Sequence, residues 1–228
     1  MQTTTRTELG QLTLRQIAAC GVDLPCRADG SIVIYFADRV LLFSREASEH
    51  EWYCVEDDVE NPISRAKVIN FLDTYKKVAL ISSDPMASFL GFASQMVWVE
   101  AAGGVVRNSR QEVVMIKRNE RWDLPKGHRE GSESFAFCAQ REAEEETGVK
   151  VAQVGKLLRT TLHSYNIYGK WELKLTAWYE MWADSTEELT PQAEEGIVAA
   201  EWIGQDRIES CINSSYPTIK EVFAALLE

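Results

Sequence analysis

A run of glutamates in the second half of the chain constrains its fold and chemistry more than any other feature. The run contains Glu142, Glu144, Glu145 and Glu146. Gly148 follows it and is typical of the residue just after a helix end. A helix over residues 134–147 places Glu142, Glu145 and Glu146 at i, i+3 and i+4, so their side chains share one face.

The same helix face is apolar toward its N-terminus, where it carries Phe135, Cys138 and Ala139. Three carboxylates at its other end are unfavourable, because like charges one turn apart repel by roughly 0.2–0.5 kcal/mol per pair. They also face the negative end of the helix dipole, and a buried charge needs a partner. Carboxylate oxygens are the ligands that Mg²⁺ and Mn²⁺ prefer. The pattern therefore indicates a Mg²⁺ (or Mn²⁺) site, and an acidic helix end in solvent is the alternative.

The residues around the run match a known signature. Gly127 is followed by five residues, Glu133, seven residues and then Arg-Glu-Ala-Glu-Glu-Glu-Thr-Gly-Val over residues 141–149. This segment resembles the Nudix box, Gx5Ex7REUxEExGU with U aliphatic, at every fixed position, and Ala143 and Val149 fill the aliphatic ones. The resemblance extends over residues 96 to about 205. It implies an α+β protein with a Nudix α/β/α sandwich and a mixed sheet.

The resemblance also implies roles for individual residues. The expected metal ligands are Glu142, Glu145, Glu146 and, through a backbone carbonyl of its loop, Lys126. Arg141 is expected to orient these carboxylates through an ion pair with Glu133, or with Glu145 one turn further on.

The resemblance implies that the proton acceptor for the attacking water is a box glutamate or a carboxylate from a later loop, and the later loop offers two candidates. Glu194 and Glu195 lie just before a predicted strand, and two exposed loop glutamates are an equally good interpretation of that sequence. If one of them acts, Glu195 is preferred. The expected catalytic residues are then Glu145, Glu146, Glu195 and Arg141.

Basic residues precede the box, although the chain carries a net charge of −11. Residues 107–129 hold seven basic and three acidic side chains. This excess of basic side chains suits a polyphosphate, since cations bind phosphates. A tyrosine could in addition stack on a base. A solvated hairpin is the alternative. The candidate substrate contacts are Arg118, Arg121, Lys126, His128 and Tyr165.

The Nudix resemblance implies metal-dependent cleavage of a phosphoanhydride bond in a nucleoside diphosphate linked to another moiety. Residues 122–128, Trp-Asp-Leu-Pro-Lys-Gly-His, resemble the box entrance of members that hydrolyse dinucleoside polyphosphates or diphosphoinositol polyphosphates. Lys126 stands where many relatives have a second glycine, which bears on the substrate. A non-catalytic nucleotide sensor or regulator is the alternative, and the intact box carboxylates argue against it.

Composition bounds the partners and the compartment. The acidic charge argues against nucleic acid as a partner. Five cysteines without zinc-site spacing indicate free thiols in a reducing, cytoplasmic setting. No apolar run approaches the ~20 residues of a membrane span, so no membrane partner is expected. Homodimerisation stays open.

Two domains are expected. Residues 1–95 read as a small α+β domain of unknown role, and residues 96–228 as the Nudix domain with C-terminal helices. The first 20 residues are polar and then weakly helical in pattern. The further elements expected before residue 96 are strands at 32–36 and 39–43, a loop over 45–60, a helix from Pro62 capped by Asn61, a strand at 78–81 and a short helix opened by Asp84-Pro85.

The Nudix domain is expected to alternate strands and helices. Its predicted strands cover about 97–106, 112–117, 151–162, 171–181 and 199–203. Ser132 or Ser134 is the expected cap of the central helix, and short helices are expected over about 205–212 and 217–227.

Overall fold

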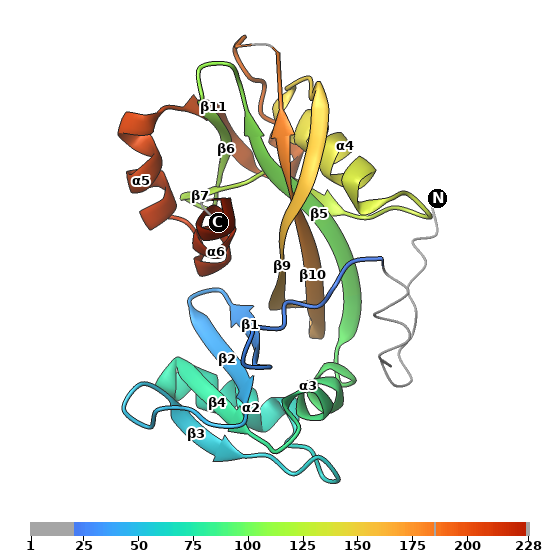
Figure 1. The fold of residues 1–228 in the computed structure, drawn as a ribbon, viewed down its shortest axis with the longest axis vertical. Helices are drawn as coiled ribbons and strands as arrows, with labels where there is room; N and C mark the ends of the chain where they lie inside the picture. Colours follow the sequence, from blue (N-terminus) through green and yellow to red (C-terminus); the bar gives the residue numbers. More distant parts are fainter. Residues whose placement is uncertain (1–20, 185, 227–228) are drawn as a thin grey trace. The chain divides into compact units, whose positions relative to one another are not determined.

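The computed structural model describes residues 21–184 and 186–226, so the weak helical pattern within residues 1–20 lies outside the described residues. The described chain forms two compact units (Figure 1). The N-terminal unit comprises residues 21–99 and 160–175, and the C-terminal unit comprises residues 100–159 and 176–226. The N-terminal unit thus includes a stretch that the sequence assigned to the Nudix domain. The domain boundary at residues 95 and 96 stays a prediction.

The N-terminal unit is a mixed sheet with two helices. Its elements are β1 (Ile32–Phe36), β2 (Arg39–Ser44), β3 (Tyr53–Glu56), α2 (Arg65–Tyr75), β4 (Lys77–Ile81) and α3 (Pro85–Ala93), with residues 160–175 of β9 (Gln153–Ile167) and β10 (Lys170–Trp182). The strand order is β10-β9-β1-β2-β4-β3. Strands β1 and β2 are antiparallel, whereas β2 and β3 both pair with β4 in parallel.

Most of the elements predicted for this unit are confirmed. The hairpin of β1 and β2 turns at Ala37, whose φ of 54° is left-handed. The loop predicted over residues 45–60 is wrong in part, because Tyr53–Glu56 form β3 through parallel pairing with β4. The helix start is also wrong: α2 begins at Arg65 with Ser64 as its cap. Ile63 lies before this helix, and its N–H donates to the side chain of Asp57.

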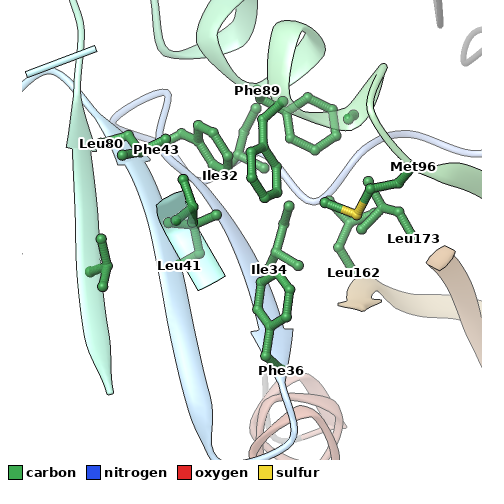
Figure 2. Close-up of a cluster of buried hydrophobic side chains, with 14 of the residues drawn as sticks. Ile32, Ile34, Phe36, Leu41, Phe43, Leu80, Phe89, Met96, Leu162 and Leu173 are labelled. Carbon is green, nitrogen blue, oxygen red and sulfur yellow. The ribbon is translucent and has the colours of Figure 1, made fainter. Parts of the chain in front are cut away.

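The core of the N-terminal unit lies between its sheet and its two helices (Figure 2). Ile34 and Phe43 of the hairpin are fully buried, and Phe43 meets Phe89 of α3 edge to face at 5.7 Å. Leu162 of β9 and Leu173 of β10 complete the same cluster and are also fully buried. Each such side chain stabilises the fold by about 1.5–3 kcal/mol relative to an exposed one.

The C-terminal unit is built around a second group of strands. Its elements are β5 (Val97–Arg107, from residue 100), β6 (Val113–Arg118), β7 (Arg121–Asp123), β8 (Lys126–His128), α4 (Phe135–Thr147), the remainder of β9 and β10, η1 (Ala193–Glu195), β11 (Ile197–Ile203), α5 (Gln205–Asn213) and α6 (Pro217–Leu226). The strand order is β11-β6-β5-β10-β9, with β7 paired to β6 and β8 paired to β5.

Helices cover both faces of this sheet (Figure 1). Val113 and Met115 of β6 pack in one cluster with Ile219 of α6. Val114 and Ile116 point to the opposite face, which α4 covers, because side chains alternate along a strand. The arrangement confirms the expected α+β class and the α/β/α sandwich.

Helix α4 begins and ends where the sequence predicted. The Ser134 side chain accepts the N–H of Phe137 at 3.1 Å, so Ser134 and not Ser132 is the cap. Gly148 has a φ of 70°, which disfavours other residues, and its N–H donates to the carbonyl of Glu144 at 2.9 Å. Among the helices of residues 21–184 and 186–226, none has the length and apolar character to cross a membrane.

Candidate active site

One face of α4 carries the box carboxylates, and two of the three are buried. Phe135, Cys138 and Ala139 begin this face as the sequence predicted, and all are buried. Glu142 and Glu146 continue it with only 7% and 1% of their surface exposed. The side chain of Glu145 is half exposed at its rim. Burial raises the pKa of the Cys138 thiol to about 12, so that this group packs as a neutral side chain.

The loop before the helix comes into direct contact with these carboxylates. Strand β8 pairs with β5, which fixes Lys126 opposite Gly103 and Gly127 opposite Ala102. The backbone N–H of Lys126 donates to Glu146 Oε2 at 2.9 Å. A Cβ atom on Gly127 would overlap the carboxylate of Glu142. Glycine is therefore required here by the close approach of the loop to the helix.

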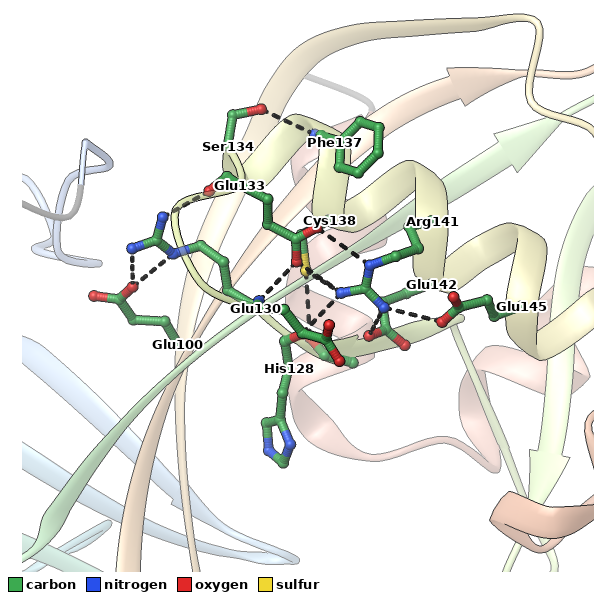
Figure 3. Close-up of polar contacts among 12 residues, drawn as sticks. Glu100, His128, Glu130, Glu133, Ser134, Phe137, Cys138, Arg141, Glu142 and Glu145 are labelled. Atoms are coloured by element: carbon green, nitrogen blue, oxygen red, sulfur yellow. Dashed lines mark hydrogen bonds and ion pairs between the residues drawn. The ribbon is translucent and has the colours of Figure 1, made fainter. Parts of the chain in front are cut away.

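Arg141 links the carboxylates to the loop (Figure 3). Its guanidinium contacts both partners considered from the sequence, Glu133 at 2.7 Å and Glu145 at 2.9 Å. It also donates to Glu142 at 2.7 Å and to the carbonyl of His128 at 3.0 Å. The hydrogen bond to Glu133, together with these other contacts, raises the pKa of Arg141 further above its ordinary value. The guanidinium thus acts as the internal cation of the site.

Glu146 is the least satisfied group of the site. Its Oε1 atom is buried and has no hydrogen-bond partner in the structure. Burial raises the pKa of Glu146 to about 7, against the opposing effect of the Lys126 ammonium. Burial also raises the pKa of Glu142, although the hydrogen bond from Arg141 opposes this. Both carboxylates therefore hold a proton or a cation more readily than a carboxylate in solvent does.

The donor set suits a hard divalent cation. Within residues 21–184 and 186–226, no three His, Cys, Asp or Glu side chains are already arranged as a metal site. Arg141 donates to both Glu142 and Glu145. The unpartnered, buried oxygen of Glu146 is the kind of ligand that Mg²⁺ or Mn²⁺ takes. The residues present thus fit a cation, which would compete with Arg141 for the carboxylates.

The loop that carries Glu195 is tied to the end of α4. The N–H groups of Thr190 and Gln192 donate to the carbonyls of Thr147 and Glu146 at 2.8 and 3.0 Å. The charge of Glu195 is one of the causes, after burial, of the raised pKa of Glu142. The structure therefore brings Glu195 to the vicinity of the box carboxylates.

The candidate substrate contacts do not form one cluster. Arg118 pairs with Glu195 at 3.5 Å, and Arg121 lies 4.8 Å from the ring centre of Tyr216. The Lys126 ammonium is largely buried against Asp123 at 2.5 Å. The ring of His128 extends away from the Arg141 network (Figure 3). Tyr165 belongs to the N-terminal unit, where its ring contacts His163 and Lys174.

Two partners at the site were missed from the sequence. Asp123 holds the Lys126 ammonium, and its spacing of three residues was the available signal. The pair between Arg118 and Glu195 left no signal, because these residues are far apart in the chain and meet only through the pairing of β6 with β11.

The chain was compared with known families and structures. A model of the NUDIX domain family matches residues 98–223. The MutT protein of Methanosarcina mazei Go1 is 17% identical over 57% of this chain and 93% of its own, with a TM-score of 0.46. A C. elegans Ap4A hydrolase, solved as a binary complex, is 20% identical over 57% of this chain and 97% of its own, with a TM-score of 0.41. The NUDIX domain of Shewanella oneidensis NrtR, complexed with ADP ribose, is 16% identical over 57% of this chain and 86% of its own, with a TM-score of 0.45.

The match to the family spans more than half of the 228 residues, so the chain belongs to the Nudix family. It is a Nudix hydrolase, an enzyme that acts on acid anhydrides in phosphorus-containing compounds. Hydrolases of this family generally use divalent metals.

Proposed function

We propose that this enzyme hydrolyses a phosphoanhydride bond in a nucleoside diphosphate linked to another moiety, with Mg²⁺ or Mn²⁺ as its cation. The observation that supports this most directly is the buried Glu146, whose Oε1 atom has no partner while its Oε2 atom accepts the N–H of Lys126. Such a carboxylate is costly unless a cation or a proton satisfies it.

The chain's own residues divide the work. Glu142, Glu145 and Glu146 hold the cation, with the Lys126–Gly127 backbone beside them. A bound divalent cation binds phosphate oxygens and lowers the pKa of a water. Arg141 is a positioning residue, because it contacts three carboxylates and the loop carbonyl of His128. Glu195 is our candidate to accept the proton of the attacking water.

Dinucleoside polyphosphates are the first substrate class to test. The argument is the resemblance of residues 122–128 to the box entrance of enzymes that cleave them, and diphosphoinositol polyphosphates follow on the same ground. Arg118 and Arg121 are partly exposed on the C-terminal unit. Lys126 now reads as a counter-charge for Asp123 and Glu146 and less as a substrate contact. The free thiols of Cys26, Cys54, Cys138 and Cys211 favour a reducing, cytoplasmic setting.

The test is Mg²⁺- and Mn²⁺-dependent hydrolysis across a panel of anhydrides. The panel contains dinucleoside polyphosphates, nucleoside triphosphates, nucleotide sugars, dinucleotide coenzymes and diphosphoinositol polyphosphates, with products identified by mass. We expect Glu145→Gln to lose at least about a hundredfold in kcat while keeping its stability. Glu144→Gln is the matched control on the same helix turn, since its amide can still accept the N–H of Val151.

The outcomes distinguish a hydrolase from a nucleotide sensor and test the role of Glu145. Cleavage of one class by the wild-type protein and by Glu144→Gln, but not by Glu145→Gln, supports the proposal. Equal turnover in Glu145→Gln and the wild-type protein would remove Glu145 from the site. Tight binding of a nucleotide without cleavage of any anhydride would favour the sensor.

A further inference from the structure

An ion pair at the end of two strands joins a cation proposed for substrate to the carboxylate proposed as base. Arg118 is the last residue of β6, and Glu195 ends η1, just before β11. The register of β6 and β11 sets Arg118 opposite Ile197, two residues after Glu195. The Arg118 guanidinium and the Glu195 carboxylate lie 3.5 Å apart. Neighbouring strands therefore hold two functional candidates together.

The pair is exposed and hence weak. The side chains of Arg118 and Glu195 are 38% and 47% exposed. Solvent and salt screen such a pair, and holding two long side chains in one geometry costs conformational entropy. A pyrophosphate carries more negative charge than one carboxylate, and the planar fork of an arginine can donate two parallel hydrogen bonds to its oxygens, whereas Arg118 and Glu195 lie 3.5 Å apart. A phosphate that reaches Arg118 can therefore displace Glu195.

The charge of Glu195 reaches the box glutamates. Its loop is hydrogen-bonded to the last turn of α4, and its charge contributes to the environment of Glu142. A Glu195 side chain released from Arg118 thus stays attached to a loop that is anchored beside the carboxylate face.

We propose that Arg118 is exchanged between two partners. In the free enzyme it holds Glu195, and a substrate phosphate takes the guanidinium and releases the Glu195 carboxylate to act at the site. This inference rests on the proposed function, because it assigns the phosphate to the substrate of the same reaction. It makes Arg118 both a phosphate contact and the positioning residue of Glu195.

The exchange can be measured without turnover. Inorganic pyrophosphate is titrated into the full-length protein in EDTA, and its Kd is read from the NMR signals of arginine side-chain N–H groups. Because Glu195 competes with the phosphate for Arg118, Glu195→Gln should tighten pyrophosphate binding by about 1.5- to 5-fold, the ratio that an exposed ion pair gives. Glu194→Gln removes the same charge one residue away, and it should change the Kd by less than about 1.5-fold.

A double variant separates competition from general repulsion. Arg118→Met should weaken pyrophosphate binding, and in that background Glu195→Gln should have no more effect than Glu194→Gln. Equal effects of Glu195→Gln and Glu194→Gln in the protein that keeps Arg118 would overturn the exchange. An undiminished effect of Glu195→Gln in the Arg118→Met background would overturn it too.

The turnover assay keeps this inference distinct from the proposed function. With a cleaved substrate, Arg118→Met should raise KM and lower kcat together, and Arg118→Lys should restore KM more than kcat, since lysine keeps the charge but not the fork. Unchanged KM and kcat in Arg118→Met would contradict the exchange while leaving the hydrolase intact. If no anhydride is cleaved, the proposed function fails, and the pyrophosphate titration still decides whether Glu195 and a phosphate compete for Arg118.

Discussion

The buried carboxylate of Glu146 makes the stability of the metal-free protein depend on pH in a direction opposite to that of most ion-paired carboxylates. Burial raises the pKa of Glu146 from its ordinary 4.5 to about 7. The folded state therefore binds a proton more tightly than the unfolded state. This group leaves the fold most stable below pH 4.5, and its penalty develops as the pH rises toward and past 7. The full penalty is about 3 kcal/mol, taken from the two pKa values at 1.36 kcal/mol per pKa unit.

Glu146→Gln removes this penalty while preserving the shape of the side chain. Its amide oxygen can still accept the N–H of Lys126, as Glu146 Oε2 does at 2.9 Å. We therefore expect the free energy of unfolding of the variant, relative to the wild-type protein, to rise by about 3 kcal/mol between pH 4.5 and pH 8. Any fixed cost of the new amide group cancels from this difference, because that cost does not vary with pH.

Urea unfolding in EDTA, followed by tryptophan fluorescence across this pH range, measures the effect. Glu144→Gln is the control, since it makes the same chemical change on the same helix turn. A stability difference that does not vary with pH, or that falls as the pH rises, would refute the reasoning. Saturating Mg²⁺ at pH 8 should reverse the ranking, because the cation stabilises the wild-type carboxylates and loses a ligand in the variant.

Three further outcomes are expected. The Gly127→Ala substitution displaces the carboxylate of Glu142. The affinity of this variant for Mn²⁺, measured by calorimetry, should therefore be about 10- to 100-fold lower than that of the wild-type protein, and an unchanged affinity would show that the loop can move aside. Ser134→Ala removes the cap of α4 and should cost about 1 kcal/mol in urea unfolding, with unchanged kcat per folded molecule. A fragment of residues 96–228 exposes Leu162 and Leu173, so it should aggregate, as measured by light scattering. Replacing Leu162 and Leu173 with threonine should reduce the aggregation, and a stable monomeric fragment without these changes would contradict the prediction.

The helix of the site was predictable because its signals are local. Periodicity, a serine cap and a terminal glycine all lie within α4 or directly beside it, and each acts over one or two turns. The burial of Glu142 and Glu146 also follows from the apolar start of the same face. The exposure of Glu145 does not follow, because three positions on one face differ in depth according to what packs against each of them.

The remaining features depend on contacts between distant parts of the chain. Strand β3 is only four residues long and exists through its parallel pairing with β4. Lys126 was predicted as a substrate contact, and its ammonium pairs with Asp123 in the structure. Residue spacing does not predict the position of the ammonium at the end of so long a side chain. The ion pair of Arg118 with Glu195 needs the register of two strands that the sequence does not specify.

The ribosome synthesises most of the N-terminal unit first, but this unit is complete only after residues 160–175 have been added. Its sheet needs residues 160–175, because Tyr35 of β1 pairs with His163 of β9 and Leu162 and Leu173 fill its core. At about 5–20 residues per second, the 80 residues from 96 to 175 take about 4–16 s to synthesise. During that interval the edge of β1 that pairs with β9 is open and the core lacks Leu162 and Leu173, so a chaperone that covers this strand during translation should raise the yield of folded enzyme.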